Sequence, residues 1–210
     1  EDISIHKEGA LELLPLVQVA HGLAQKYDVV VTNPPYMASS GMSEKLSGYV
    51  KKYNDITKQD LYSVFIDRCI ALGENKAKIG IMTSYTWMFL SSFENARKKW
   101  LYNNSIQSLI QPEYHAFFES AYVPICTFII IKGFLNYVGK YINLSEFYGA
   151  EIQDKKVLEA ITENYCEYLY TISTEKLKKI PGLVLAYWIS DNLLRVFGNT
   201  PALSTICEPK

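Results

Sequence analysis

Apolar and polar residues alternate along the chain with two spacings, which predict strands in some segments and helices in others. Short apolar runs predict strands over residues 29–32, 78–84, 106–110, 123–131 and 141–147. Apolar positions three and four residues apart predict helices over residues 10–25, 59–72, 93–102, 151–165 and 174–179. Strands that alternate with helices indicate an α/β fold, with a mixed sheet and flanking helices.

The segments between these elements carry fewer signals. Residues 37–57 form a long polar stretch, and a loop of that length in a compact domain is usually functional or mobile. Ser91 or Ser92 is predicted to cap the helix over residues 93–102. Asp60 opens another helix, where we expect its charge to interact favourably with the helix dipole rather than to take part in chemistry.

The most informative stretch is residues 27–36, with the sequence Tyr-Asp-Val-Val-Val-Thr-Asn-Pro-Pro-Tyr. Its β-branched residues are apolar on both faces, which predicts a strand buried on both sides, as in a parallel sheet covered by helices. Asn33, Pro34, Pro35 and Tyr36 follow at the carboxyl end, where open α/β sheets bind ligands. Because prolines fix φ and donate no hydrogen bond, we predict a stiff tip with free carbonyl groups.

An amide, a bare carbonyl and an aromatic ring at such a tip suit the activation of a conjugated amino group. That nitrogen is a poor nucleophile because its lone pair is delocalised into the ring. The side-chain oxygen of Asn33 and the carbonyl of Pro34 would accept its two hydrogens, orient the lone pair and stabilise the growing positive charge. Tyr36 would stack on the face of the base. The alternative is that Asn-Pro-Pro is only a turn.

This stretch resembles the catalytic motif of methyltransferases that use S-adenosylmethionine to methylate adenine N6 in DNA. The resemblance continues through Trp87, Phe93 and residues 60–72, 78–84, 97–101, 117–131 and 180–189. It covers about residues 27–197 and points to type IIG restriction–modification proteins and to the methyltransferase of BREX phage-defence systems. The fold that it implies is a partial Rossmann-like methyltransferase fold.

The resemblance also implies roles for individual residues. Asn33 and Pro34 accept hydrogen bonds from the target amino group, and Tyr36 stacks on a base flipped out of double-stranded DNA. Phe118 matches a phenylalanine beside the flipped base, and Asn33 is also expected to contact the cofactor, S-adenosylmethionine. Thr32 stands where the family often has glycine, which leaves open how closely the cofactor approaches. Methylation of a glutamine in a protein, or a non-catalytic interaction module, are the alternative functions.

Composition narrows the class of protein. Hydrophobic residues make up 49% of the chain and charged residues 20%, which indicates a packed core rather than disorder. The net charge of −1 does not favour tight binding of DNA phosphates. The basic clusters at residues 51–52, 97–99 and 176–179 are more typical of solvated helix faces. We therefore expect most DNA affinity to reside in other segments of the full-length protein.

The four cysteines are widely separated, without a Cys-x-x-Cys pair or a histidine at zinc spacing. They are expected to be free thiols in a reducing compartment, and no metal site is predicted. The longest apolar run, residues 123–131, has the length of a strand rather than of a membrane span. These features favour a cytoplasmic protein.

Residues 1–26 contain neither the glycine-rich turn nor the acidic residue that a nucleotide cofactor needs. We therefore expect a fragment, with residues 1–150 as the catalytic-loop half of a methyltransferase domain and residues 151–210 as a helical extension toward a target-recognition region. Alone, it is expected to be inactive and not to bind S-adenosylmethionine at micromolar concentrations. Self-association, or residues 1–26 themselves, are expected to cover the unpaired edge of the strand over residues 29–32.

Overall fold

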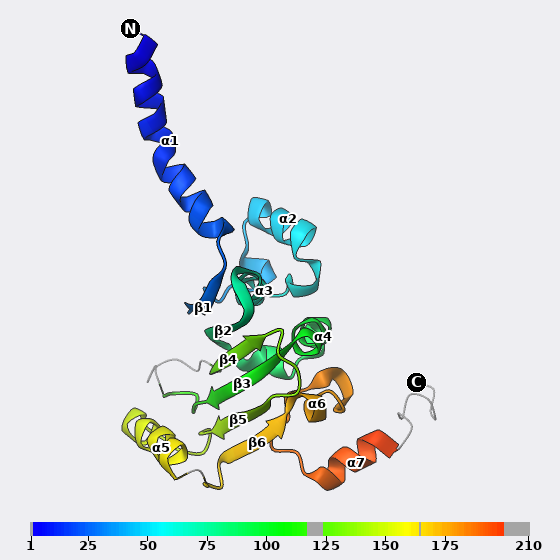
Figure 1. Ribbon diagram of the computed structural model, residues 1–210. Coiled ribbons are helices and arrows are strands. Elements are labelled where there is room, and N and C mark those ends of the chain that lie inside the picture. The colour runs from blue at the N-terminus through cyan, green and yellow to red at the C-terminus, as the bar shows by residue number, and fades with distance from the viewer. Residues whose placement is uncertain (1, 117–123, 164, 200–210) are drawn as a thin grey trace.

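The computed structural model describes residues 2–116, 124–163 and 165–199, and side chains from residue 9 onward. Its centre is a six-stranded sheet with the strand order β1-β2-β4-β3-β5-β6 (Figure 1). The strands are β1 (Tyr27–Thr32), β2 (Gly73–Ser84), β3 (Asn104–Gln111), β4 (Ile125–Lys132), β5 (Val138–Asn143) and β6 (Leu169–Ser173).

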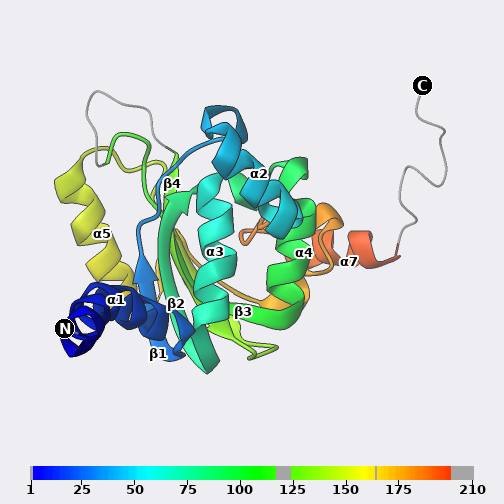
Figure 2. The ribbon, with the colours of Figure 1, turned by 90° about the horizontal axis from the view of Figure 1, so that it is seen from above.

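Helices accompany the sheet throughout the described residues. They are α1 (Asp2–Ala24), α2 (Glu44–Tyr53), α3 (Leu61–Leu72), α4 (Glu94–Asn103), α5 (Ala150–Thr162), α6 (Thr174–Leu177) and α7 (Asp191–Asn199). Helices α3 and α4 lie against one face of the sheet, whereas α1 projects away from it (Figures 1 and 2). The main core fills the space between that face and these two helices. None of the described helices combines the length and apolar character that a membrane span needs.

The strand pairing confirms the predicted α/β fold with a mixed sheet. β1 and β2 are parallel, β4 runs antiparallel to both β2 and β3, β3 and β5 are parallel, and β6 is antiparallel to β5. The long apolar strand β4 is central, as its composition suggests. Pro124 immediately precedes it, so the missing N–H of the proline costs the sheet no ladder hydrogen bond.

β1 is far more exposed than its apolar sequence predicts. Val29 and Val31 are 59% and 75% exposed, so the prediction of a strand buried on both sides is wrong. The reason is position: β1 is an edge strand that pairs only with β2 within the described residues. Val30, which points the other way, packs against the main core. The strand is therefore covered on one face only.

Residues 37–57 are not the structureless loop that their polarity suggests. They contain α2, flanked by the short 3₁₀ turns Ser39–Gly41 and Asp55–Thr57. The side chain of Ser43 caps α2 by accepting a hydrogen bond from the amide of Leu46.

Two further predictions are corrected by the backbone. Ser91 and Ser92 lie in a 3₁₀ turn and do not cap α4, which begins after Phe93 without a side-chain cap. Residues 151–210 are not only helical, because β6 joins the sheet through antiparallel pairing with β5. The sheet therefore continues beyond residue 150, the expected domain boundary.

The N-terminal residues do not cover the free edge of β1. Residues 2–24 form α1, so they supply no strand to that edge. The helix leaves many apolar side chains exposed: Leu11, Leu13, Leu14, Leu16, Val17, Val19 and Leu23. The expectation that residues 1–26 cover the edge is thus wrong, and self-association stays a prediction.

Arg97 anchors residues 180–189 to the rest of the fold. It is 1% exposed, and its guanidinium group donates to the carbonyl of Gly182 at 3.0 and 2.8 Å. It also donates to the carbonyls of Trp87 at 2.8 Å and Leu90 at 2.7 Å. Gly182 presents its carbonyl from a turn with φ of 67°, a conformation that glycine adopts readily. Burial lowers the pKa of Arg97, and nearby Glu94 partly opposes this effect.

Replacing Arg97 by methionine is expected to lower the free energy of unfolding by about 3 kcal/mol, because three carbonyl groups each lose a charged donor at once. Urea denaturation of the protein measures this loss. Lys98→Met on the same helix is the matched control, since its ion pair with Glu94 is exposed to solvent and contributes little to stability. Equal losses in the two variants would contradict the anchoring role.

Candidate functional site

The residues that the sequence singled out lie together at the carboxyl end of β1. Asn33, Pro34 and Tyr36 line a hollow of about 480 Å³, whose remaining walls are Pro35, Met82 and Ile125. The β1–β2 ladder ends where Thr32 lies opposite Ile81, so Asn33 is the first residue beyond it. Asn33 and Tyr36 are exposed. The Pro34 carbonyl accepts no hydrogen bond from any described residue, as the proline pair predicts.

The side chains of Tyr36 and Asn33 contact each other directly. The Tyr36 hydroxyl donates a hydrogen bond of 3.2 Å to Oδ1 of Asn33. Partial burial, with a smaller contribution from Cys126, raises the pKa of Tyr36 above its usual value. The hydroxyl therefore keeps its proton and remains a donor, while Oδ1 of Asn33 is the acceptor that faces it.

Two aromatic rings, those of Tyr62 and Phe93, support the ring of Tyr36 from the protein interior. Its ring meets the ring of Tyr62 edge to face, with centroids 6.2 Å apart, and Tyr62 stacks on Phe93 at 5.9 Å. Tyr62 is 2% exposed, and its hydroxyl lies 3.0 Å from Oγ1 of Thr86. Tyr36 itself is 40% exposed, so the protein holds part of the residue while the rest remains accessible.

The tip is also tied to the start of α3. Oδ1 of Asp60 accepts hydrogen bonds from the amides of Met37 and Tyr62, at 3.0 and 3.2 Å. Asp60 is thus the N-cap residue of α3, which agrees with its predicted place at a helix N-terminus. The amide of Leu61 donates to the carbonyl of Met37, and that of Ser39 to the carbonyl of Gln59. These contacts close residues 39–59 into a loop with α2 at its far end.

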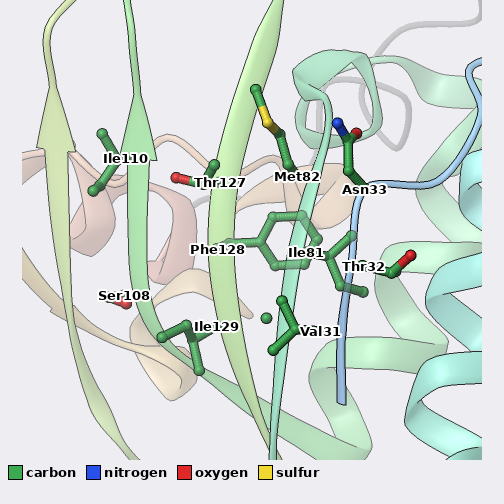
Figure 3. A pocket seen from close by; sticks show the side chains of 11 residues that line it. Val31, Thr32, Asn33, Ile81, Met82, Ser108, Ile110, Thr127, Phe128 and Ile129 are labelled. Carbon is green, nitrogen blue, oxygen red and sulfur yellow. The ribbon is translucent and has the colours of Figure 1, made fainter.

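An apolar groove of about 420 Å³ adjoins the tip on the sheet surface (Figure 3). It crosses β1, β2, β4 and β3, and its lining residues are Val31, Thr32, Asn33, Gly80, Ile81, Met82, Ser108, Ile110, Thr127, Phe128 and Ile129. Asn33 and Met82 line both this groove and the hollow at the tip. Asn33 therefore stands where the two spaces meet.

Sequence reasoning found the contiguous part of the site and missed the rest. Tyr62, Met82 and Ile125 were not predicted to contribute. Met82 lies near the end of β2, which pairs with β1, and Ile125 begins β4, which pairs with β2. The signal that could have found them is strand order, because residues at the ends of neighbouring strands meet at one edge of a sheet. Phe118, the predicted neighbour of the substrate, lies outside the described residues.

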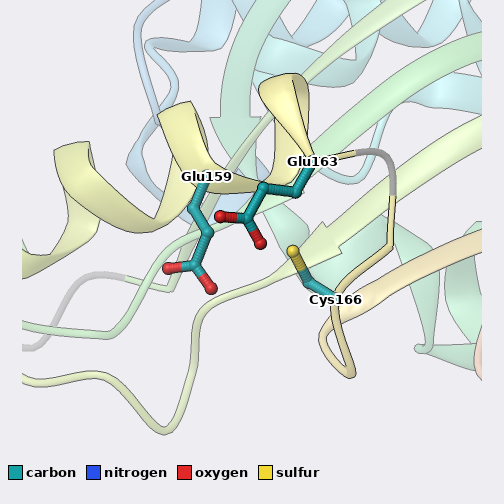
Figure 4. Close-up of side chains that lie close together, drawn as sticks. All are labelled: Glu159, Glu163 and Cys166. Carbon is teal, nitrogen blue, oxygen red and sulfur yellow. The ribbon is translucent and has the colours of Figure 1, made fainter.

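One group of potential metal ligands lies between α5 and β6, near the edge of the sheet opposite β1. Ligand atoms of Glu159, Glu163 and Cys166 all fall within 4.8 Å of one another, at the end of α5 (Figure 4). The sequence signal that could have found it is a Glu pair four residues apart, followed by a cysteine. Lys156 already forms a 2.6 Å ion pair with Glu159, and the interaction lowers the pKa of that carboxyl. The group is therefore partly neutralised without a metal ion.

Comparisons with known proteins give matches in both sequence and fold. A sequence profile described as Eco57I restriction-modification methylase matches residues 4–118. The adenine-specific methyltransferase BrxX of Escherichia coli O9:H4 (strain HS), a BREX protein, is 33% identical over 200 residues. That match covers 95% of this chain but 16% of the relative, so the chain spans about a sixth of its length.

Solved structures share the fold at low sequence identity. A structure of the type I restriction–modification system, 17% identical, has a TM-score of 0.62 and covers 89% of this chain and 42% of its own. The DrdV–DNA complex, 12% identical, has a TM-score of 0.57 and covers 84% of this chain and 20% of its own. The second of these relatives is bound to DNA.

Proposed function

The chain belongs to the Eco57I restriction-modification methylase family, and we propose that in the longer protein its Asn33–Tyr36 tip activates the N6 amino group of adenine in DNA for methylation. The observation that carries this proposal is the hollow at the tip. It is bordered by the exposed Asn33 side chain, by the Pro34 residue whose carbonyl is free among the described residues, and by Tyr36.

The proposed chemistry follows from these three groups. Oδ1 of Asn33 and the carbonyl of Pro34 each accept one hydrogen of the amino group. With both hydrogens held, the nitrogen lone pair points away from the acceptors, and the partial charges of the two oxygens stabilise the positive charge that develops on nitrogen. The accessible part of the Tyr36 ring holds the flipped adenine by stacking. Met82 and Ile125 supply apolar walls that exclude water from the base.

The methyl donor of this family is S-adenosylmethionine, and the described residues do not suffice to hold it. The groove beside Asn33 is apolar apart from Thr32, Asn33, Ser108 and Thr127, and no carboxylate or glycine-rich turn lines it. A nucleotide-type cofactor needs both of those features. We therefore assign to Asn33 only a contact with the reacting end of the cofactor.

Adenine is favoured over the other functions that the motif allows. The BrxX relative, which matches nearly all of the chain, is adenine-specific by name. A non-catalytic module has no need for a carbonyl on a buried proline, Pro34, that lacks a donor among the described residues beside an exposed aromatic ring, because buried acceptors are usually satisfied within the protein. The chemistry of the tip and the family thus support the same substrate.

Helix α2 offers a face that fits DNA near this tip. Tyr49 and Tyr53 are 58% and 60% exposed with ring centroids 4.8 Å apart, and Nζ of Lys52 lies 4.9 Å from the Tyr53 ring. Lys45 lies one turn before Tyr49, and neither Lys45 nor Lys52 forms an ion pair within the described part of the chain. The helix stands at the end of the sheet where β1 ends (Figure 2). We assign it a contact with the phosphate backbone.

Asn33→Ala in the full-length protein is expected to lower the methylation rate by about 10²–10³-fold, because one of two transition-state acceptors is lost. Incorporation of labelled methyl groups into DNA measures the rate. Asn103→Ala is the matched control, since that amide bonds only within α4. Near-wild-type turnover of Asn33→Ala, in a protein with an unchanged melting temperature, would exclude Asn33 from catalysis.

Tyr36→Ala is expected to weaken capture of the flipped base by about 1–3 kcal/mol, whereas Tyr36→Phe should have a mild effect because the ring does the stacking. Fluorescence of 2-aminopurine at the target position reports base flipping in DNA titrations. If the phenylalanine variant were as defective as the alanine variant, stacking could not be the main contribution of Tyr36.

Replacing both Lys45 and Lys52 by glutamine should weaken DNA binding and reduce the dependence of log affinity on log salt by about 2, one unit for each lost phosphate contact. Binding of the full-length protein across a salt series measures the slope. Lys155→Gln combined with Lys179→Gln is the control, with the same charge change elsewhere on the chain. Identical slopes for both double variants would remove α2 from the interface.

A further inference from the structure

We infer that Asp60 is a positioning residue for the Asn33–Tyr36 tip, and that a single carboxylate oxygen sets both the backbone and the ring of the site. The inference rests on the proposed function, because the groups that Asp60 positions are those assigned to methyl transfer. It goes beyond that function by naming a residue that acts through others and does not touch the substrate.

One oxygen atom makes both contacts. The amide of Met37, directly after the tip, and the amide of Tyr62, in the first turn of α3, both donate to Oδ1 of Asp60. An ordinary N-cap carboxylate would satisfy only the helix amide. Here the same atom joins the helix to Met37, the residue directly after the tip, which lies 23 residues earlier in the sequence.

An external acceptor matters for the tip because its own residues offer few backbone donors, and none of them bonds across residues 33–36 in the described structure. Pro34 and Pro35 have no amide hydrogen, so the segment from Asn33 to Tyr36 has few donors of its own. Beyond the tip, Ala38 and Asp60 form an isolated antiparallel bridge. The bond from Leu61 to Met37 measures 2.9 Å, and that from Ser39 to Gln59 measures 3.1 Å. Asp60 lies at the centre of this contact.

Asp60 also acts on the stacking ring through Tyr62. Its oxygen holds the Tyr62 amide, and the buried Tyr62 ring supports the Tyr36 ring edge to face. The position of Asn33 depends on where the chain leaves the tip, and the position of Tyr36 depends on the ring beneath it. Displacing Asp60 therefore shifts the acceptor and the stacking ring together, and a shift of about 1 Å near reacting atoms costs about 10²-fold in rate.

The simpler alternative is that Asp60 only caps α3 and contributes stability. The two roles separate by side-chain length. Asp60→Asn keeps an oxygen at the same place and preserves both hydrogen bonds. Asp60→Ser keeps a capping oxygen for the helix but is too short to reach Met37. Asp60→Ala loses both bonds, and Ser173→Ala removes the cap of the remote helix α6 as a control for cap loss alone.

The test uses the full-length protein and three measurements: kcat and KM for DNA methylation, hydrogen exchange at the Met37 amide, and melting temperature. We expect Asp60→Asn to match the wild type in all three. Asp60→Ser should keep the melting temperature, exchange faster at Met37 and lose about 10²-fold in kcat with a smaller change in KM. Asp60→Ala should show the same losses and a lower melting temperature, and Ser173→Ala should lose only stability.

Wild-type kcat and wild-type Met37 exchange in Asp60→Ser would overturn the inference, as would a lower kcat without faster exchange. Asp60→Asn as defective as Asp60→Ala would also overturn it, because the role would then require the charge. If the wild-type protein methylates no DNA, the proposed function fails. Exchange at Met37 in the serine and asparagine variants still decides whether Asp60 positions the tip.

Discussion

The parallel pairing of β1 with β2 is the interaction on which the candidate site depends. β1 has no second strand partner among the described residues, so this ladder and the packing of Val30 on the main core set its position. β2 is held in turn by β4, with Ser84 opposite Ile125. The carboxyl ends of β1 and β2 therefore meet the amino end of β4. This is why the hollow takes Asn33, Met82 and Ile125 from three different segments.

Most helices and strands could be predicted because the spacing of apolar residues is a local property of the sequence. The exposure of β1 could not be predicted, because a short run of valines is compatible with a central strand and with an edge strand alike. Only the insertion of β4 between β2 and β3, a long-range event, decides the order of the sheet. Helix α2 was missed because the polar composition of residues 37–57 was weighed above the helical spacing of Leu46, Tyr49, Val50 and Tyr53.

Within the site, Asn33, Pro34 and Tyr36 could be proposed from the sequence because their chemistry is carried by adjacent residues. The contacts that hold these residues in place could not be predicted from the sequence. Asp60 reads from the sequence as an ordinary helix N-cap, and nothing local shows that its oxygen also accepts the Met37 amide. Closing a loop costs entropy that rises only slowly with its length, so residues 39–59 can contain a helix without loosening the contact at their base.

The acceptor on Asn33 already holds the Tyr36 hydroxyl, so binding of an amino group exchanges one donor for another. At 3.2 Å the bond is long for a hydroxyl donor, and both side chains are exposed, so water competes for each of them. The exchange therefore costs little free energy. Until it happens, the contact keeps Oδ1 directed toward Tyr36, on the side where the base would stack. In the proposed mechanism the ring of Tyr36 would stack on the base, and its hydroxyl would orient Asn33.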